Sequence, residues 1–354
     1  MIEDEQLKHS NDGRPREGLT RVAEQPRKII ENSLFEYPLS LADTTEYRTP
    51  EEKLFVLAHL GVPSIEIADW KLAVTGLVNR SLSLTYDQLS YFPKYQVTSV
   101  HQCAGNPLNP AYPTRTISNL EWNGVLLREV LAHAGVQTSA THVWAFGLDF
   151  GELQIEEFRS EPQQHYVKDI PLDYVMTADV LLATHLNGRP LSEKHGFPAR
   201  LVVPGFYGHN SVKWLCRLQL ENRRADGLFT TELYNDSDPL TGGTKPVWKI
   251  APESIIVTPA EGSAVAGPDV EIAGWAWSYG EVRLVEISTD DGTTWHRADV
   301  EPRRNLSWQR FRYCWFPPGP GQFNLTSRTT DIDGQVQPMS HARNAVHQIV
   351  VTVR

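Results

Sequence analysis

Apolar residues recur along the chain with two different periods. Trp70 to Val74 and Tyr95 to Val100 are short runs rich in β-branched and aromatic residues, which predicts strands. Leu126 to Ala134 spaces its apolar residues three and four positions apart, which predicts a helix. Residues 36–250 are therefore expected to form one domain of mixed α and β structure.

The pattern changes near residue 251, where short β-rich runs alternate with turn clusters. Val282 to Ser288 and Thr293 to Val300 flank the turn sequence Asp290-Asp291-Gly292, which predicts a hairpin. We expect residues 251–354 to form a β-sandwich. Five of the ten tryptophans lie in this stretch, more than a small core requires, which favours a homodimer through this domain: Trp275, Trp277, Trp295, Trp308 and Trp315.

Residues 1–35 are polar and charged with little periodicity, so we expect an arm that becomes ordered only against the rest of the chain. The longest apolar runs fall well short of the roughly 20 residues that span a bilayer. The first residues lack the basic start and the apolar stretch of a secretory signal. These features predict a cytoplasmic protein that does not enter a membrane.

Charge and cysteine content narrow the function further. The formal charge of -10, with 43 acidic against 33 basic residues, argues against nucleic acid as a partner. Three cysteines are too few and too scattered for a disulfide framework or a structural zinc site. Cys216 and Cys314 lie in apolar, strand-like runs, which predicts that both serve packing.

Cys103 stands apart from the other two cysteines. It ends a predicted strand and leads into Ala104-Gly105-Asn106-Pro107, a loop that presents the thiol at a sheet edge. The thiol is then a small buried hydrophobe, a nucleophile assisted by His101, or a soft ligand for a transition metal. The residues of the loop alone leave these three interpretations open.

A second cluster of polar side chains runs from residue 195 to residue 213. Its hydrogen-bond donors alternate with glycines, which allow a backbone to approach a ligand closely. Such donors together favour a loop that holds an anionic phosphate or the polar edge of a heterocycle: His195, Arg200, His209, Ser211 and Lys213.

From about Phe55 to the C-terminus, the chain resembles the sulfite oxidase family. The resemblance implies an α+β molybdopterin-binding domain followed by an immunoglobulin-like domain that pairs two subunits. Four segments in the family's order carry it: Phe55 to Pro63, His101 to Asn106 with Trp122 to Val125, His195 to Trp214, and the tryptophan-rich sandwich.

The resemblance implies a molybdenum-molybdopterin cofactor, with Cys103 as the thiolate ligand of the metal. It implies oxidation of sulfite, or a similar small oxyanion, to sulfate by oxygen transfer. It further implies that six residues hold the pyranopterin and its phosphate: His59, Asp149, His195, Arg200, Ser211 and Lys213.

The chain departs from the family where the substrate anion binds. Leu57 and Leu108 stand where the family has arginines, Asn210 replaces a third, and the family's active-site tyrosine has no clear counterpart. A buried dianion without compensating charge is costly, so other groups must supply it. Arg115 and Arg343 are the expected catalytic replacements among six candidates: His101, His209, Arg115, Arg223, Arg224 and Arg343.

Three functions remain in competition at this level. The first is sulfite oxidation with an external electron acceptor, because the chain has no haem-attachment or dinucleotide-binding motif. The second is reduction of an S-oxide or N-oxide, for which a pocket with Leu57 and Leu108 is better suited. The third is a cofactor-free interaction protein that binds through its sandwich domain.

Overall fold

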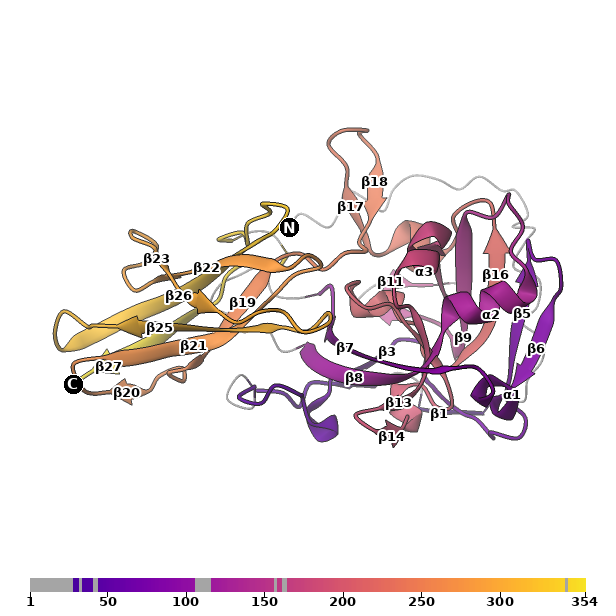
Figure 1. The fold of residues 1–354 in the computed structure, drawn as a ribbon, viewed down its shortest axis with the longest axis horizontal. Coiled ribbons are helices and arrows are strands. Elements are labelled where there is room, and N and C mark those ends of the chain that lie inside the picture. The colour runs from indigo at the N-terminus through magenta and orange to yellow at the C-terminus, as the bar shows by residue number, and fades with distance from the viewer. Residues whose placement is uncertain are drawn as a thin grey trace.

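The computed structural model describes residues 28–31, 34–40, 44–105, 116–155, 158–160, 164–340 and 343–354. Figure 1 shows a larger domain and a smaller, elongated C-terminal sandwich joined end to end. The described part is mostly sheet, with three short α-helices: α1 (Tyr86–Ser90), α2 (Leu127–Ala134) and α3 (Leu172–Thr177). The predicted α+β class is therefore right only in outline, because strands dominate both domains.

The larger domain is built around two sheets. The first has five strands in the order β12-β9-β16-β5-β6, with β16 and β5 parallel and the other neighbours antiparallel. Helix α2 packs Val130 and Leu131 into the hydrophobic core that this sheet forms. It lies where the spacing of apolar residues predicts a helix. The strands of this sheet are β5 (Lys71–Gly76), β6 (Leu82–Thr85), β9 (His142–Gly151), β12 (Gln164–Pro171) and β16 (Leu215–Glu221).

The second sheet carries the segment around Cys103. Its order is β14-β13-β8-β7, and β15 also pairs with β13. The pairing of β7 with β8 ends at Gln102 and Ile117, so the ladder stops one residue before Cys103. The strands are β7 (Lys94–Gln102), β8 (Ile117–Leu126), β13 (Leu181–Leu186), β14 (Arg189–Pro190) and β15 (Arg200–Val202).

Short strand pairs and single helical turns connect these sheets. The described part of the N-terminal arm pairs with the larger domain through β1 (Lys28–Glu31) on β4 (Val62–Ser64) and β2 (Leu34–Glu36) on β3 (Val56–Ala58). The remaining short elements are β10 (Gln154–Ile155), β11 (Phe158–Arg159), β17 (Asn235–Ser237), β18 (Thr244–Pro246), η2 (Glu51–Lys53), η3 (Glu193–His195), η4 (Gly208–Asn210) and the π-helix η5 (Leu228–Glu232).

The C-terminal domain is a sandwich of two sheets, in the orders β19-β21-β25-β24 and β20-β27-β26-β22-β23. Ile272 and Phe311 from one sheet pack against Ile287, Leu325 and Val351 from the other. The strands are β19 (Glu253–Thr258), β20 (Ala264–Val265), β21 (Val270–Trp277), β22 (Val282–Ser288), β23 (His296–Arg297), β24 (Asp299–Val300), β25 (Gln309–Trp315), β26 (Gly321–Asp331) and β27 (Gln348–Val353).

Two predictions for this domain need correction. The expected second hairpin strand divides in two: β23 pairs with β22, whereas β24 crosses to the other sheet and pairs with β25. Cys314 is exposed, because the alternation along β25 turns Phe311 and Trp315 inward and Cys314 outward. Cys216 is buried, as predicted.

Three of the C-terminal tryptophans serve the junction between the domains. Trp275, Trp277 and Trp308 lie in one buried cluster with residues of the larger domain such as Val100 and Ile117. Their indole N–H groups also point away from the sandwich core: that of Trp308 donates to the Tyr47 carbonyl at 2.9 Å. The tryptophan surplus is thus explained by contacts within the chain, which removes it as an argument for a dimer.

No helix in the described ranges is long and apolar enough to cross a membrane.

Candidate active site

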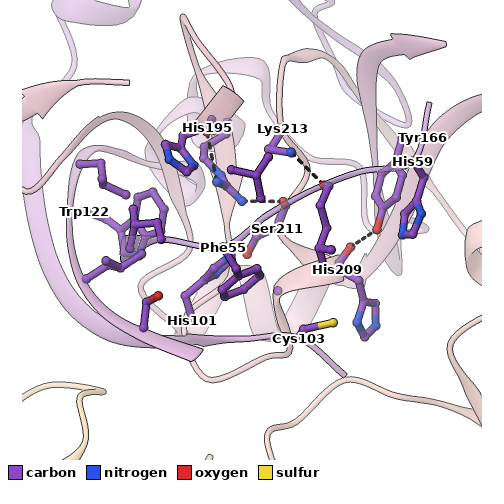
Figure 2. Close-up of a pocket in the computed structure, with 18 of the residues that line it drawn as sticks. Phe55, His59, His101, Cys103, Trp122, Tyr166, His195, His209, Ser211 and Lys213 are labelled. Atoms are coloured by element: carbon purple, nitrogen blue, oxygen red, sulfur yellow. Dashed lines mark hydrogen bonds between the residues drawn. The ribbon is translucent and has the colours of Figure 1, made fainter. Parts of the chain in front are cut away.

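A cavity lies where the ends of β7 and β8 meet the loops around η3 and η4 (Figure 2). All seven residues expected to bind the metal or the pterin line it, although they are distant in the sequence: His59, Cys103, Asp149, His195, Arg200, Ser211 and Lys213. Among the described residues, no three His, Cys, Asp or Glu side chains gather into a self-contained metal site. The cavity therefore combines a single thiol with a set of nitrogen and oxygen donors.

Cys103 lies just beyond the end of β7, and Figure 2 shows its sulfur at the same end of the cavity as His209. Its N–H donates to the Thr116 carbonyl at 2.9 Å, and its Sγ accepts from the Gly105 N–H at 3.3 Å. Burial raises the pKa of the Cys103 thiol, while the Gly105 N–H, Thr116 and Arg343 offset part of that rise. The thiol is thus held by backbone contacts and deprotonates most readily when it binds a cation.

Two cations line the cavity, the buried Arg200 and the partly buried Lys213. Arg200, the first residue of β15, donates to the carbonyls of His195 and Ser211, each at 3.1 Å, and stacks 5.0 Å from the Trp122 ring. Lys213 donates to the Leu57 carbonyl at 2.9 Å. These bonds fix both side chains, and within the described residues no carboxylate shares a hydrogen bond with either charge.

The glycines of this region are required by close packing. Gly196 has φ +103°, and a Cβ there would lie 3.1 Å from the Lys213 side chain and 3.2 Å from that of Arg200. A Cβ on Gly208 would lie 3.0 Å from the His101 ring. The predicted alternation of glycines and donors is therefore what lets the donors converge on one space.

Several polar atoms in the cavity wall are buried and have no hydrogen-bond partner among the residues that the structure describes. Buried polar atoms normally have hydrogen-bond partners, so several unpaired ones around one cavity indicate a polar ligand. The unpaired atoms include Nδ1 of His59, Nδ1 of His209, Oγ of Ser118, Nε1 of Trp122 and Nε of Arg200. This donor set fits a molybdopterin, whose phosphate and ring edges offer acceptors, with Cys103 available to the metal.

The field in the cavity is positive. Burial and the charge of Lys213 lower the pKa of His59 to about 4. Burial, Arg200 and Lys213 lower that of His195 to about 3. Lys213 itself has its pKa lowered to about 7, by burial and by Arg200, against the partial opposition of Asp149. An anionic ligand would relieve this repulsion.

The same pKa shifts predict an acid-sensitive cofactor-free protein. A base whose pKa is lower in the folded state binds fewer protons there than in the unfolded chain, so stability rises with pH between the two values. For His59, His195 and Lys213 this range begins near the folded values of about 4, 3 and 7. We expect the melting temperature to rise by about 5 °C or more from about pH 5 to about pH 8.

Differential scanning fluorimetry of cofactor-free protein across this pH range measures the effect. Lys213→Met should flatten the upper part of the profile, because the variant has no buried ammonium there to deprotonate. His296→Gln, at an exposed position in the other domain, serves as the control and should leave the profile unchanged. A flat profile for the parent protein would contradict the electrostatic description of the cavity.

The structure also brings in side chains that sequence reasoning missed. Tyr166 and Tyr234 line the cavity, although the sequence alone assigned no tyrosine to the site. The Tyr234 hydroxyl lies 3.1 Å from Nε2 of His59, and the Tyr234 ring stacks on His209 with centroids 4.1 Å apart. Neither tyrosine belongs to a contiguous motif; only the pairing of β12 with β9 and the turn after η5 bring them to this cavity.

The expected anion-binding groups divide into three sets. His101 and His209 line the cavity. Arg343 does not: its guanidinium pairs with Asp236 at 2.7 and 3.0 Å, so its catalytic role stays a prediction. Arg224 pairs with Asp169 and Arg223 with Asp226, both outside the cavity.

Arg115, the last of the candidate anion-binding groups, and three positions that differ from the family complete this comparison. Arg115 and Leu108 lie outside the described residues. Leu57 lines the cavity, as expected from its place before His59. Asn210 is fully buried, and its amide donates to the carbonyls of Tyr207 and Val247 at 3.1 and 3.2 Å, which gives it a structural role.

Comparisons with known proteins follow the division of the chain. The oxidoreductase molybdopterin binding domain matches residues 59–229, and the Mo-co oxidoreductase dimerisation domain matches residues 244–350. Mitochondrial sulfite oxidase of Rattus norvegicus is 33% identical over 350 residues, which cover 88% of this chain and 62% of the relative. Sulfite oxidase of Gallus gallus is 32% identical over 327 residues, and the match covers 84% of this chain and 69% of the relative.

One solved structure matches nearly the whole chain. The sulfane dehydrogenase SoxCD from Paracoccus pantotrophus superimposes with a TM-score of 0.74 at 28% identity, over 93% of this chain and 90% of that chain. The chain spans 62% of the length of the rat and mouse sulfite oxidases that it matches.

Proposed function

The chain belongs to the sulfite oxidase family of molybdenum-cofactor oxidoreductases, and we propose that it oxidises sulfite or a similar small sulfur oxyanion, passing electrons to an external acceptor. The observation that carries the proposal is the cavity in which the Cys103 thiol shares one space with partnerless buried donors. A cofactor-free interaction protein would not need this arrangement, because partnerless buried donors destabilise a fold that has no ligand for them.

Different residues of the cavity are proposed to bind the phosphate, the metal and the pterin of the cofactor. The bound molybdenum cofactor supplies the two-electron, oxygen-transfer chemistry, and the protein supplies binding and orientation. Arg200 and Lys213 would hold the phosphate through charge-assisted hydrogen bonds. Cys103 would provide a soft thiolate ligand for the metal. The proposed roles of His59, Asp149, His195 and Ser211 are hydrogen bonds to the pterin.

Three residues of the cavity wall that are not assigned to the cofactor are electrically neutral: His101, His209 and Tyr234. Burial lowers the pKa of His101 and of His209 well below the usual histidine range, so both imidazoles are uncharged at neutral pH. Burial raises the pKa of the Tyr234 phenol, which keeps its proton. These three side chains can donate hydrogen bonds to a substrate oxygen without adding a full positive charge.

A second candidate function follows from this low charge. Among the described residues, the arginines and lysines that line the cavity are Arg200 and Lys213. Both are proposed to hold the phosphate of the cofactor. The apolar Leu57 and the superposition on a sulfane dehydrogenase favour oxidation of a less charged sulfane sulfur. Reduction of an S-oxide or N-oxide is a third possibility that the same screen resolves.

The test is a substrate screen on purified protein from a host that makes molybdopterin. Molybdenum and pterin are first determined, and we expect about one equivalent of each per chain. Sulfite and a persulfide are then offered with ferricyanide as acceptor, and dimethyl sulfoxide with a reduced dye as donor. Turnover of sulfite supports the first function and turnover of the persulfide the second. Protein without metal and pterin, or turnover of the sulfoxide alone, would overturn the proposal.

Leu57→Arg is expected to improve sulfite binding. One charge-assisted hydrogen bond contributes roughly 1.5 to 3 kcal/mol, so the KM for sulfite should fall about tenfold or more and become salt-dependent. Steady-state kinetics at several salt concentrations measure the change. Leu57→Met is the control for altered shape without charge. An unchanged KM in Leu57→Arg would contradict the interpretation that lost charge at this position limits sulfite affinity.

The proposed quaternary structure is a homodimer through an immunoglobulin-like C-terminal domain. The support is the match of residues 244–350 to the dimerisation domain. Light scattering at micromolar concentration should give twice the chain mass of 39.9 kDa.

A further inference from the structure

The strand that leads to Cys103 is bonded to the C-terminal domain by its backbone. The Val100 N–H donates to the Leu306 carbonyl at 3.0 Å, and the Leu306 N–H donates to the Thr98 carbonyl at 3.1 Å. Leu306 lies in the loop between β24 and β25 of the sandwich. Strand β7 therefore pairs with β8 on one edge and meets the second domain on the other.

Gln102, the residue before Cys103, places its side chain entirely within the C-terminal domain. It is fully buried, and its Oε1 accepts from the Trp277 indole N–H at 2.8 Å. Its Nε2 donates to Oδ1 of Asn344 at 3.2 Å and to the carboxylate of Glu253, which is also buried. An amide in such a network has little freedom to move, because any shift leaves a buried polar group unpaired.

Ala104, the residue after Cys103, is held by the same domain. Nε of Arg343 donates to the Ala104 carbonyl at 2.9 Å. The two terminal nitrogens of Arg343 donate to the Asp236 carboxylate in β17, at 2.7 and 3.0 Å. This bidentate pair fixes the plane of the guanidinium, so the Ala104 carbonyl meets a rigid donor.

We infer that Gln102 and Arg343 are positioning residues, through which the C-terminal domain sets the direction in which Cys103 presents its sulfur to the metal. The domain holds the residues on both sides of Cys103, and the Cys103 N–H itself is bound to Thr116. Replacing a group that orients a metal ligand typically costs about 10- to 100-fold in metal affinity or activity. The inference rests on the proposed function only in taking Cys103 as the metal ligand.

Arg343→Met tests the inference in the holoenzyme. The measurements are molybdenum content, melting temperature, the sulfur-to-molybdenum charge-transfer absorption band, and kcat and KM for the substrate found in the screen. We expect a shifted band and a kcat lower by about 10- to 100-fold, with molybdenum content and KM little changed. Arg343→Lys, which keeps one donor, should restore part of both effects.

Arg328→Met is the matched control. Arg328 lies in the same domain, has the same side-chain exposure of 27%, and also pairs with a carboxylate, that of Glu286. Its contacts are with Glu286 and the Trp295 ring rather than with a residue next to Cys103, so its variant should keep the parent band and kcat. If Arg343→Met matches Arg328→Met in band and kcat, the inference is wrong. A raised KM with an unchanged band would also overturn it, because that result assigns Arg343 to substrate binding.

A second variant approaches Cys103 from the other side. In Gln102→Met with Glu253→Gln, the amide network is broken without leaving a buried carboxylate unpaired, and the same band shift is expected. An unshifted band in a folded, molybdenum-containing protein would count against the inference. If the parent enzyme does not turn over any sulfur substrate, the proposed function fails, yet the band still reports how the sulfur meets the metal.

Discussion

Replacing Cys103 with serine is expected to lower turnover by about a thousandfold or more, equivalent to roughly 4 kcal/mol of lost transition-state stabilisation. A hydroxyl is a hard and weakly acidic ligand, so it replaces a thiolate poorly on a metal in a sulfur-rich environment. The fold should persist, because the bond from the Cys103 N–H to the Thr116 carbonyl joins backbone atoms, and a serine hydroxyl can accept from the Gly105 N–H in place of the sulfur. Pterin content should remain high, since Arg200 and Lys213 are held by the carbonyls of His195, Ser211 and Leu57 and not by Cys103.

The measurement combines steady-state turnover with molybdenum and pterin analysis of the same preparations. Cys216→Ser and Cys314→Ser are the controls: the first replaces a buried thiol that contacts the Phe146 carbonyl, and the second an exposed one. Both should keep parent activity. Parent-like turnover in Cys103→Ser would remove Cys103 from the metal and leave the cavity without its proposed soft ligand.

Arg200→Met is expected to weaken cofactor binding by about 10- to 100-fold. The Nε atom of Arg200 is a buried donor with no partner in the described part of the chain, and a hydrogen bond from a charged donor is worth roughly 1.5 to 3 kcal/mol. Methionine keeps much of the apolar contact with Trp122 but removes the charge. Preparations of the variant should therefore contain little pterin and little molybdenum.

Pterin fluorescence after denaturation and molybdenum by mass spectrometry give the occupancy directly. Arg217→Met is the matched control, because Arg217 also stacks on an aromatic ring, at 3.8 Å from the centroid of Phe146, but does not line the cavity. Its occupancy should equal that of the parent. Full occupancy in Arg200→Met would show that the phosphate is held elsewhere.

The parts of the site that could be predicted are those encoded by neighbouring residues. The glycine-and-donor loop from residue 195 to residue 213 has a recognisable composition, and Cys103 stands at a strand end followed by a turn sequence. The structure brings both into one cavity. Tyr166 and Tyr234 could not be predicted in this way, because their approach depends on how distant strands pair.

The local sequence pattern was also sufficient to predict single helices and strands, but it did not predict which elements pack or pair with one another. The apolar spacing of Leu126 to Ala134 predicts a helix, and α2 covers Leu127–Ala134. The run from Thr293 to Val300 looks equally regular, yet its two halves join different sheets. The tryptophans show the same limit: their number is visible in the sequence, whereas the surface that buries Trp275, Trp277 and Trp308 is not.

The burial of these three tryptophans constrains how the chain can be divided. Each domain has its own hydrophobic core, which would ordinarily allow independent folding. A cut near residue 251, however, would uncover large aromatic side chains on one piece and their apolar contacts, such as Val100 and Ile117, on the other. Separating the two domains at this point would therefore give two aggregation-prone pieces.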